Sequence, residues 1–508
     1  MVRNAQSSFG SGLPRSLLWL SLSLVAAAGA PATLLAADFY VDGSNGSDAN
    51  TGRSWAAAKQ TIQAAVDEAG LVPGSDTVHV AAATYWESVD ITHELTLRGG
   101  YPAGGGIRDL ARHETTIRGF TFLPCLFIAG AGEVMVDGFT IRGGGGYYDP
   151  ATNRSQGGGL YVESSEVSLK NLVITGNRVE GRCDAVYDYA TSSCDVDKQL
   201  APEGAALYAD DSSICMVNCL IVGNTVEYAA YEDWDCRGTC GGGPDWPTTG
   251  GIIYALMRGG DFSARHSTVA DNRCDAWDVY DYECESAMMS SGSGRYWSGR
   301  NILWGFTGTA IVGSDYFDYN PELGHSIIGS GNLEGPGNLS EDPLFTRGPL
   351  GDYYLSQVSA GQSVDSPGID AGGAPAAWTG IDDRTTRTDE LADTGDADIG
   401  YHYPIPLAPV LLLTKGSTRL HYAPEDGEVY DLIRGRLSEL RDQGTYIDLG
   451  AVECVADDDT SGLVLDELSP SEPPAGDVFW YQLGNQADGL KYGQSGGKEL
   501  VPGSGDCP

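Results

Sequence analysis

Short apolar runs separated by glycine and asparagine turns dominate the chain. Between Gly157 and Asp275 one pattern occurs three times: a glycine-led apolar strand, a turn, a second strand and an asparagine turn. Alignment of the three copies brings Asn177, Asn224 and Asn272 into register. A single copy cannot bury its own apolar face, so the copies must stack on one another. The pattern predicts an all-β repeat protein.

Fainter copies extend the repeat on both sides, around residues 136–144, 300–305 and 325–329. Their spacings are 33, 47, 48, 35 and 25 residues, so about 25 residues make one bare unit and the surplus is insertion. The residues that share the position of Asn171 in this alignment are Gly138, Asn171, Asn218, His266, Asn301 and Ser326.

Two repeat architectures fit these spacings. Units of 47 and 48 residues match the blades of a β-propeller, which need about 40–50 residues each. However, the insertions are polar and do not have the pattern of strands, and a unit of 25 residues is too short for a blade. We therefore favour a stacked coil.

The start of the chain carries one amphipathic helix, expected over residues 59–69 with Ile62, Ala65, Val66 and Ala69 on one face. A Tyr-Val-Asp strand and a loop that ends in Ser-Trp precede it, and a Pro-Gly turn and a Thr-Val strand follow. This opening resembles that of secreted bacterial right-handed parallel β-helix proteins with the pectate-lyase-like scaffold. In such proteins the helix covers the open end of the stack.

The end of the same region resembles the closing phrase of that group. Residues 366–372 and 398–403 match it, although Gly368 and the pair Tyr401-His402 depart from the usual residues. The resemblance implies a right-handed parallel β-helix over residues 38–403. Similar openings occur in polysaccharide lyases and in non-enzymatic surface proteins, so the resemblance indicates the fold and leaves the activity open.

A second, smaller domain is expected at the C-terminus. Residues 404–410 are rich in proline and predict a linker, and residues 411–508 contain alternating strands. They are similar to a fibronectin type III-like module, a small β-sandwich. We expect the strands around Ile433 and Trp480 to face each other across its core, with Trp480 inside.

Residues 1–37 have the pattern of a secretory signal peptide, with an apolar core over residues 17–28 and small residues before position 38. No other stretch is long and apolar enough to span a membrane. Arg3 and Arg15 are the only charges in the signal, so its removal changes the net charge from −40 to −42. Such a charge repels nucleic acid and anionic membranes. We expect a secreted bacterial protein that stays soluble or associates with the cell surface.

Eleven cysteines in an exported chain predict disulfide bonds. Three pairs are close in sequence within the insertions: Cys183 with Cys194, Cys236 with Cys240, and Cys274 with Cys284. Cys454 and Cys507 are placed to clamp the C-terminal module. Cys125, Cys215 and Cys219 remain, in strand-like contexts.

The insertions all leave the repeat just after the asparagine turn, so a stacked coil brings them to one face. They combine aromatic rings, which stack on sugars, with carboxylates, which accept hydroxyl hydrogen bonds or bind Ca2+. We expect a platform that binds an extracellular glycan or cell-surface component, with Ca2+ as a candidate cofactor. The alternative is that the rings form small cores beneath closed loops while the acids stay solvated. The twelve residues of this candidate site, the loop set, are Tyr187, Asp188, Tyr189, Asp233, Trp234, Asp235, Trp246, Trp277, Asp278, Tyr280, Asp281 and Tyr282.

A polysaccharide lyase or glycoside hydrolase on the same scaffold is the competing function. A glycosidase needs paired carboxylates, and the insertions contain too many acids to single out a pair. A lyase needs a basic residue to abstract a proton, and the sequence singles out no catalytic residue. His266 occupies an asparagine position, where a satisfied turn residue is expected. The basic residues along the stack are Lys170, Arg258, Arg265, His266, Arg273, Arg295 and Arg300.

Overall fold

The computed structural model describes the chain from residue 36 onward, with gaps. The described ranges are 36–71, 74–149, 154–188, 193–199, 201–229, 251–257, 260–277, 286–292, 296–305, 309–313, 324–329, 335–406, 412–413, 419–421, 430–439, 441–442, 446–459, 463–465, 479–485, 494–495 and 498–501. The expected signal peptide and most of the expected linker therefore lie outside the described residues.

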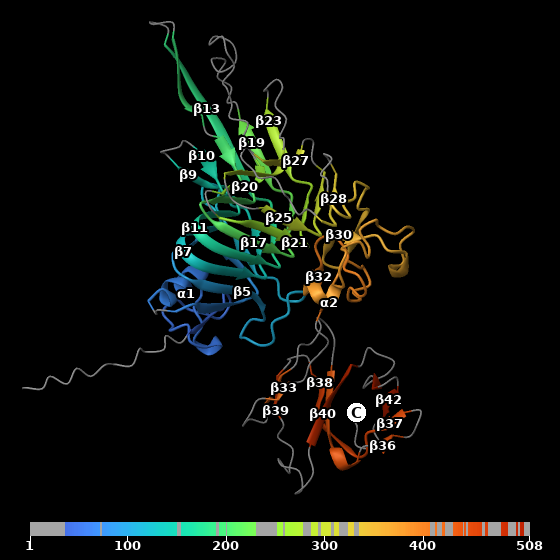
Figure 1. Cartoon of the computed structure of the whole chain (residues 1–508). Coiled ribbons are helices and arrows are strands. Elements are labelled where there is room, and N and C mark those ends of the chain that lie inside the picture. The colour runs from blue at the N-terminus through green and yellow to red at the C-terminus, as the bar shows by residue number, and fades with distance from the viewer. Residues whose placement is uncertain are drawn as a thin grey trace, which may run out of the picture. The chain divides into compact units, whose positions relative to one another are not determined.

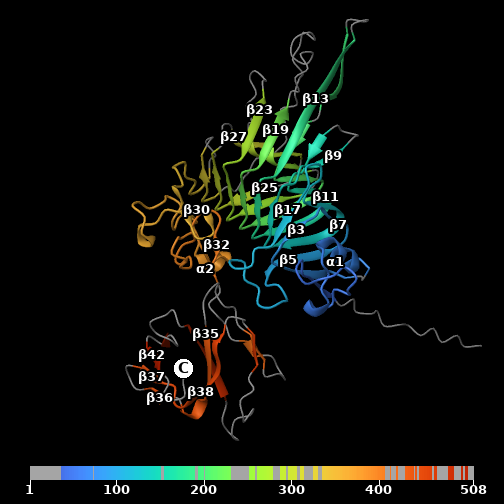
Figure 2. The same ribbon diagram turned by 180° about the vertical axis from the view of Figure 1, so that it is seen from behind.

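The two largest sheets of the described chain are parallel (Figures 1 and 2). The first has thirteen strands: β1 (Asp38–Val41), β2 (Asp76–Ala81), β4 (Val89–Ile91), β5 (Leu95–Tyr101), β7 (Leu126–Asp137), β11 (Leu160–Lys170), β16 (Leu207–Asp210), β17 (Ser213–Val217), β20 (Gly251–Met257), β21 (Phe262–Arg265), β24 (Ser286–Gly292), β25 (Tyr296–Gly299) and β27 (Thr309–Gly313). The second has eight: β3 (Thr84–Trp86), β6 (Thr116–Arg118), β8 (Thr140–Arg142), β12 (Val173–Thr175), β18 (Leu220–Val222), β22 (Thr268–Ala270), β26 (Ile302–Trp304) and β28 (Ile327–Ile328).

The strand register explains how the core is built. Each repeat of the chain, which we call a round, adds one strand to the eight-stranded sheet. This strand is parallel to the strand of the previous round. Because side chains alternate between faces along a strand, this register stacks apolar residues above one another on the inner face. One such buried column consists of Ile117, Ile141, Ile174, Ile221, Val269, Leu303 and Ile328. This continuous parallel pairing does not fit the separate four-stranded blades of a propeller.

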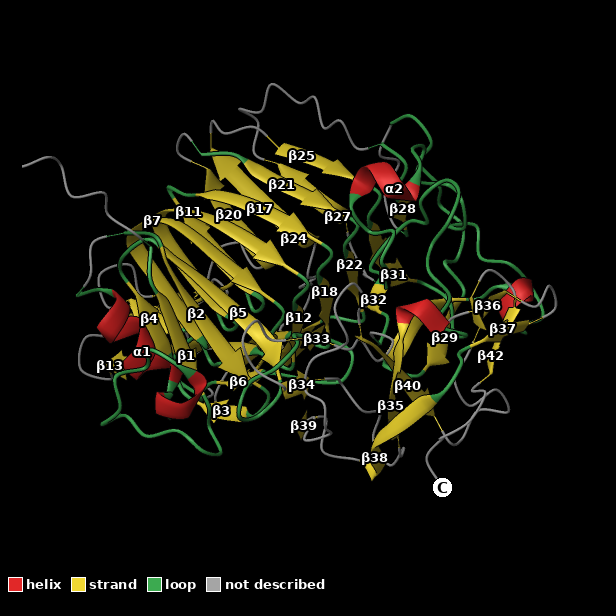
Figure 3. Cartoon of the chain, turned by 90° about the horizontal axis from the view of Figure 1, so that it is seen from below, coloured by secondary structure: helices red, strands yellow, loops and turns green. Residues whose placement is uncertain are grey.

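The expected helix is confirmed as α1 (Ile62–Ala69), and its buried residues are the predicted four. Thr61 caps its N-terminus by accepting a hydrogen bond from Ala64 N. The Glu87 carboxylate accepts two more, from the backbone N–H groups of Ile62 and Gln63, each at 2.9 Å. The helix packs against the first strands, at one end of the row of strands that Figure 3 shows. No helix in the described part of the chain is long and apolar enough to cross a membrane.

The predicted asparagine ladder is present and buried. Asn177 donates to Asn224 Oδ1 at 3.0 Å, and Asn224 donates to Asn272 Oδ1 at 3.0 Å. The same two oxygens accept the backbone N–H groups of Asn177 and Asn224. Each Asn224 and Asn272 amide also donates to a strand carbonyl of the preceding round, at 2.8 Å. The ladder therefore satisfies the buried polar groups at the turn where the chain leaves the eight-stranded sheet.

A second column of turn residues corrects the sequence alignment by one position. Each of its members has a left-handed backbone, and they are Gly138, Asn171, Asn218, His266, Arg300 and His325. Asn301 and Ser326 were aligned with this column, but the strand register places them one residue later, level with Ser267. Asn301 Oδ1 accepts from Ser267 N, and Asn301 N donates to Ser326 Oγ, so these two residues form a separate column.

Contrary to the expectation from their polar sequences, the insertions do contain strands, which begin immediately after the asparagine ladder. β13 (Arg178–Asp188), β19 (Thr225–Ala229) and β23 (Arg273–Trp277) pair in parallel and extend beyond the two large sheets (Figures 1 and 2). β14 (Ser193–Gln199) returns antiparallel to β13. A small sheet of β9 (Tyr147–Asp149), β10 (Arg154–Gln156) and β15 (Ala201–Glu203) is also present.

The register of the β13–β14 hairpin contradicts one expected disulfide. Cys183 lies opposite Gln199, whereas Cys194 lies opposite Tyr187. Four residues of strand separate the two cysteine levels, roughly 13 Å, and a disulfide requires Cα atoms within about 7 Å. Among cysteines with described side chains, Cys125, Cys215 and Cys219 are free thiols and Cys454 is disulfide-bonded. The other expected pairs fall at least partly outside the described residues.

The C-terminal part contains three small sheets. They are β33 (Leu412–Leu413), β34 (Arg419–His421) and β39 (Leu463–Leu465); β38 (Val452–Asp459), β35 (Tyr430–Arg436) and β40 (Phe479–Asn485); and β36 (Arg441–Asp442), β37 (Tyr446–Asp448), β42 (Lys498–Val501) and β41 (Gln494–Ser495). β35 and β40 are antiparallel neighbours, with Gly435 opposite Trp480. The expectation that they face each other across a core is therefore wrong, because they hydrogen-bond within one sheet. The expected burial of Trp480 lies outside the described side chains.

Removal of one ladder residue should destabilise the stack. We expect Asn224→Ala to lower the free energy of unfolding by roughly 2–4 kcal/mol, because it leaves buried backbone and amide groups without partners. Urea unfolding followed by circular dichroism measures the loss. Asn45→Ala is the matched control, because exposed Asn45 donates only to Asp42. Equal losses in the two variants would contradict the structural role of the ladder.

His266 generates a dependence of stability on pH. Burial, followed by the charges of His402, Arg300 and Arg265, lowers the pKa of His266 to about 2. The pKa of a histidine in the unfolded chain is about 6.5. Because the unfolded state binds the proton more readily, this contribution to stability is complete above about pH 6.5. It falls by up to about 1.4 kcal/mol per pH unit as the pH is lowered.

We expect His266→Asn to remove this acid-dependent loss, since asparagine tolerates a left-handed backbone. Urea midpoints at pH 7.0 and pH 4.5 should differ less in the variant than in the wild type, by roughly 2–3 kcal/mol of stability. His79→Asn provides a control at a histidine that hydrogen-bonds Asp38 and Tyr101. Parallel pH profiles for the wild type and His266→Asn would show that the account of His266 is wrong.

Candidate functional site

The outer face of the eight-stranded sheet is divided into a covered half and an open half. On this face, one residue of each strand from β3 to β26 lies in register with its counterpart on the next strand, which forms an outward column. In order along the sheet they are Trp86, Arg118, Arg142, Thr175, Val222, Ala270 and Trp304. The later members are apolar and the earlier ones are aromatic and basic, so one sheet presents two different surfaces.

The covered half packs against tyrosines from the end of the parallel region. Leu220, Val222 and Ala270 are buried together with Tyr354, Tyr401 and Tyr403. The rings of Tyr354 and Tyr403 are stacked at 3.9 Å, and these two side chains are 0% and 2% exposed. Burial of this apolar face attaches the returning chain to the sheet.

Hydrogen bonds place the returning segment across several rounds. Gly400 N donates to Arg300 O at 2.9 Å, and Tyr401 N donates to Thr268 Oγ1 at 3.0 Å. The Asn218 side chain then makes two hydrogen bonds with the His402 backbone, one as donor and one as acceptor, although the residues are 184 positions apart. The segment thus runs back along the stack toward the open half.

A buried histidine–aspartate pair locks this segment. His402 Nε2 lies 2.9 Å from Asp393 Oδ2, and the two side chains are 0% and 3% exposed. His402 Nδ1 faces Gly400 O, so both ring nitrogens are engaged. Nearby, burial and the Asp393 charge raise the pKa of Asp398. Because the pair is almost completely buried, we assign it the role of holding residues 393–402 in place.

The open half carries an exposed tryptophan and two arginines. Trp86 is 59% exposed, and the Arg118 guanidinium carbon lies 4.2 Å from the centre of its ring. Arg142 is exposed and is the next residue in the column. Neither arginine forms an ion pair in the described part of the chain. On a protein with a net charge of −40, this is a local basic and aromatic surface.

Exposed apolar side chains directly follow the end of β6. Phe120, Phe122 and Leu123 follow β6 in sequence and are 46%, 72% and 45% exposed. Backbone hydrogen bonds tie this turn to the glycines after β8, since Gly145 N donates to Phe120 O at 2.9 Å. We call the residues Trp86, Arg118, Arg142, Phe120 and Phe122 the aromatic–arginine face.

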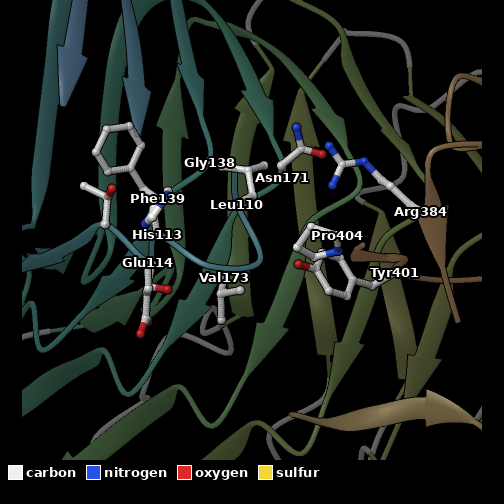
Figure 4. Close-up of a pocket in the computed structure, with 12 residues that line it drawn as sticks. Leu110, His113, Glu114, Gly138, Phe139, Asn171, Val173, Arg384, Tyr401 and Pro404 are labelled. Carbon is white, nitrogen blue, oxygen red and sulfur yellow. The ribbon is translucent and has the colours of Figure 1, made fainter. Parts of the chain in front are cut away.

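A small pocket lies where the open and covered halves meet (Figure 4). Its volume is about 60 Å3, and Thr140 and Val173 contribute to its floor from β8 and β12. The loop at residues 110–115 lines one side. Arg384, of β31 (Arg384–Thr385), and Pro404, of β32 (Tyr403–Pro404), line the other together with Tyr401.

A second, larger hollow lies on the first sheet and is acidic. Its cavity is about 660 Å3 and includes Glu94, Glu133, Glu166 and Asp211. Glu133 and Glu166 are direct register partners, so like charges follow one another along the stack. In the described residues no group of three His, Cys, Asp or Glu side chains is arranged to hold a metal ion.

The loop set lies almost entirely outside the described residues. The exceptions are Tyr187, Asp188 and Trp277, for which the strand backbone is described and the side chain is not. Trp277 lies level with Ala229 and hence with Arg182. Tyr187 and Asp188 are therefore five and six residues farther along the sheet, roughly 16–20 Å. The three residues start from one sheet but at different levels.

Of the candidate residues for proton abstraction, His266 and Arg300 occupy structural positions in the described chain. His266 is 1% exposed, and neither ring nitrogen has a hydrogen-bond partner. His266 is a turn residue, as expected. However, its ring lacks the hydrogen bonds that we expected. The guanidinium of Arg300 donates to Gly372 O at 2.6 Å, which is a structural contact. Arg258 and Arg295 lie outside the described residues.

Sequence reasoning missed the aromatic–arginine face, although a signal was present. The phrase Thr-Ile-Arg-Gly occurs twice, ending at Gly119 and Gly143. Its alternation predicts an inward isoleucine and an outward arginine in both copies. Alignment of the two Thr-Ile-Arg-Gly copies brings Arg118 and Arg142 to the same position on neighbouring strands. By contrast, no sequence pattern brings Arg384 or Tyr401 to the pocket, since they come from the returning segment.

Comparison with known proteins adds no family assignment. No family model matches the chain, and no curated protein gives a significant match. The functional conclusion therefore depends on the residues themselves.

Proposed function

We propose that this protein is a secreted extracellular glycan-binding protein built on a right-handed parallel β-helix of the pectate-lyase-like type. The observation that carries the proposal is the aromatic–arginine face, where the Arg118 guanidinium lies over the ring of exposed Trp86 and Arg142 follows Arg118 on the next strand. The two large parallel sheets and the small helix content support the scaffold.

The chemistry of this face suits sugars. The flat ring of Trp86 offers an apolar surface for the C–H groups of a pyranose, and Phe122 offers a second ring. Arginine supplies several N–H donors in a fixed plane, which suits hydroxyl or carboxylate oxygens. Because the arginines lack ion-pair partners in the described chain, binding does not require an existing salt bridge to break.

The loop set and the C-terminal module complete the proposed protein. The aromatic and acidic loops would extend the glycan contact, with Ca2+ organising some of their carboxylates. The fibronectin type III-like module would act as a second, non-catalytic domain. The signal-like first 37 residues and the strongly acidic composition support export.

Replacement of the exposed ring should weaken glycan binding. We expect Trp86→Ala to reduce retention on plant, algal and bacterial glycans by about tenfold, the equivalent of about 1.4 kcal/mol of stacking. We expect Arg142→Gln to reduce it about threefold. A glycan array followed by calorimetry measures both. Trp378→Ala is the control, because Trp378 is 82% exposed but lies in α2 (Ala376–Thr379), away from the face. Unchanged retention in Trp86→Ala would contradict the proposed site.

The insertions should contribute separately. We expect Trp234→Ala and Trp277→Ala each to reduce glycan retention, and EDTA to reduce it further if Ca2+ organises the loops. The same array measures these effects. Robust release of reducing ends or of unsaturated uronates by the wild type would favour the lyase or glycosidase alternative over a binding role.

A further inference from the structure

The pocket between the open and covered halves of the eight-stranded sheet contains a cation without a full set of partners. The Arg384 side chain is 12% exposed, and its Nη1 is buried and has no hydrogen-bond partner. Its nearest carboxylate, Asp383 Oδ1, lies 3.6 Å from Nε and belongs to a side chain that is 77% exposed. Water screens such an exposed charge strongly. The guanidinium therefore lines the pocket with a positive charge that no buried carboxylate neutralises within the described chain.

A second donor lies beside Arg384. Tyr401 lines the same pocket, and its hydroxyl makes no hydrogen bond within the described structure. Burial raises the pKa of Tyr401, and the Arg384 charge partly offsets this effect, which shows that the two groups are close. The phenol is therefore protonated at neutral pH and can donate.

The pocket is sized for a small group. Its volume of about 60 Å3 exceeds the roughly 10–15 Å3 that one water requires, so it admits a few heavy atoms. Glu114 lies on the far side of the pocket from Arg384 (Figure 4). Its negative charge disfavours doubly charged anions such as sulfate or hydrogen phosphate.

We propose that this pocket binds a single carboxylate group, which pairs with the Arg384 guanidinium that lines the pocket and accepts a hydrogen bond from the Tyr401 hydroxyl. The carboxylate can belong to a free small acid or to an acidic sugar bound on the adjoining face, since Thr140 in the pocket and Arg142 on the face are two residues apart on β8. The inference concerns different residues from the glycan proposal and does not rest on it.

Calorimetric titration of the full mature chain with sodium acetate, at constant ionic strength, tests the proposal. We expect millimolar affinity, as befits a ligand of four heavy atoms, and much weaker binding of sulfate. Arg384→Gln should weaken acetate binding at least tenfold, and Tyr401→Phe about threefold. Arg384→Lys retains the charge and should lose less than Arg384→Gln. Arg347→Gln is the control, because the Arg347 side chain is 87% exposed. Circular dichroism melts establish that each variant is folded.

Methyl glucuronate distinguishes the two sources. If it binds no more tightly than acetate and is insensitive to Trp86→Ala, the group is a free acid. If it binds more tightly and loses affinity in both Arg384→Gln and Trp86→Ala, the group belongs to a sugar. Acetate binding that is absent in the wild type, or unchanged in Arg384→Gln, would overturn the inference. That outcome would not affect the glycan-binding proposal, which the Trp86→Ala variant tests separately.

Discussion

Hydrogen-bond satisfaction at the turns is the constraint on which the described stack depends. Each round must turn sharply between sheets, and its backbone groups are then shut away from water. The amides of Asn177, Asn224 and Asn272 solve this problem by bonding to one another and to the neighbouring rounds. Because the amide can both donate and accept, every added round satisfies the one before it. This continuity lets insertions of different length leave the stack without disturbing the core.

The returning segment gives the outer face its functional asymmetry. The tyrosines at positions 354, 401 and 403 cover the apolar later strands, and the buried His402–Asp393 pair fixes the segment that carries two of them. The returning segment covers the eight-stranded sheet only as far as Val173. Trp86, Arg118 and Arg142 therefore remain accessible. The pocket forms at this boundary, where Arg384 and Tyr401 meet the earlier strands. A single folding-back of the chain thus produces both the exposed face and the pocket beside it.

The sequence predicted the features that depend on local periodicity. The three ladder asparagines, the buried face of α1 and the parallel stacking follow from the spacing of apolar and turn residues. Three predictions failed because they needed strand register or pairing. Asn301 belongs one position later than expected, and Cys183 lies opposite Gln199 rather than near Cys194. The strands around Ile433 and Trp480 pair within one sheet instead of facing each other across a core. The pocket could not be predicted, because it joins Thr140 to residues more than 200 positions later. Tyr401 and His402 depart from the closing phrase that this region resembles, and both residues make the contacts that hold the covering segment.

Hydrogen–deuterium exchange of the protein, with and without a glycan that it retains on the array, tests the central claim most directly. The account predicts slower exchange on binding in residues 84–87, 116–123 and 140–146, which form and border the aromatic–arginine face. Protection confined to the insertions after the asparagine ladder, with no change in these three segments, would contradict it.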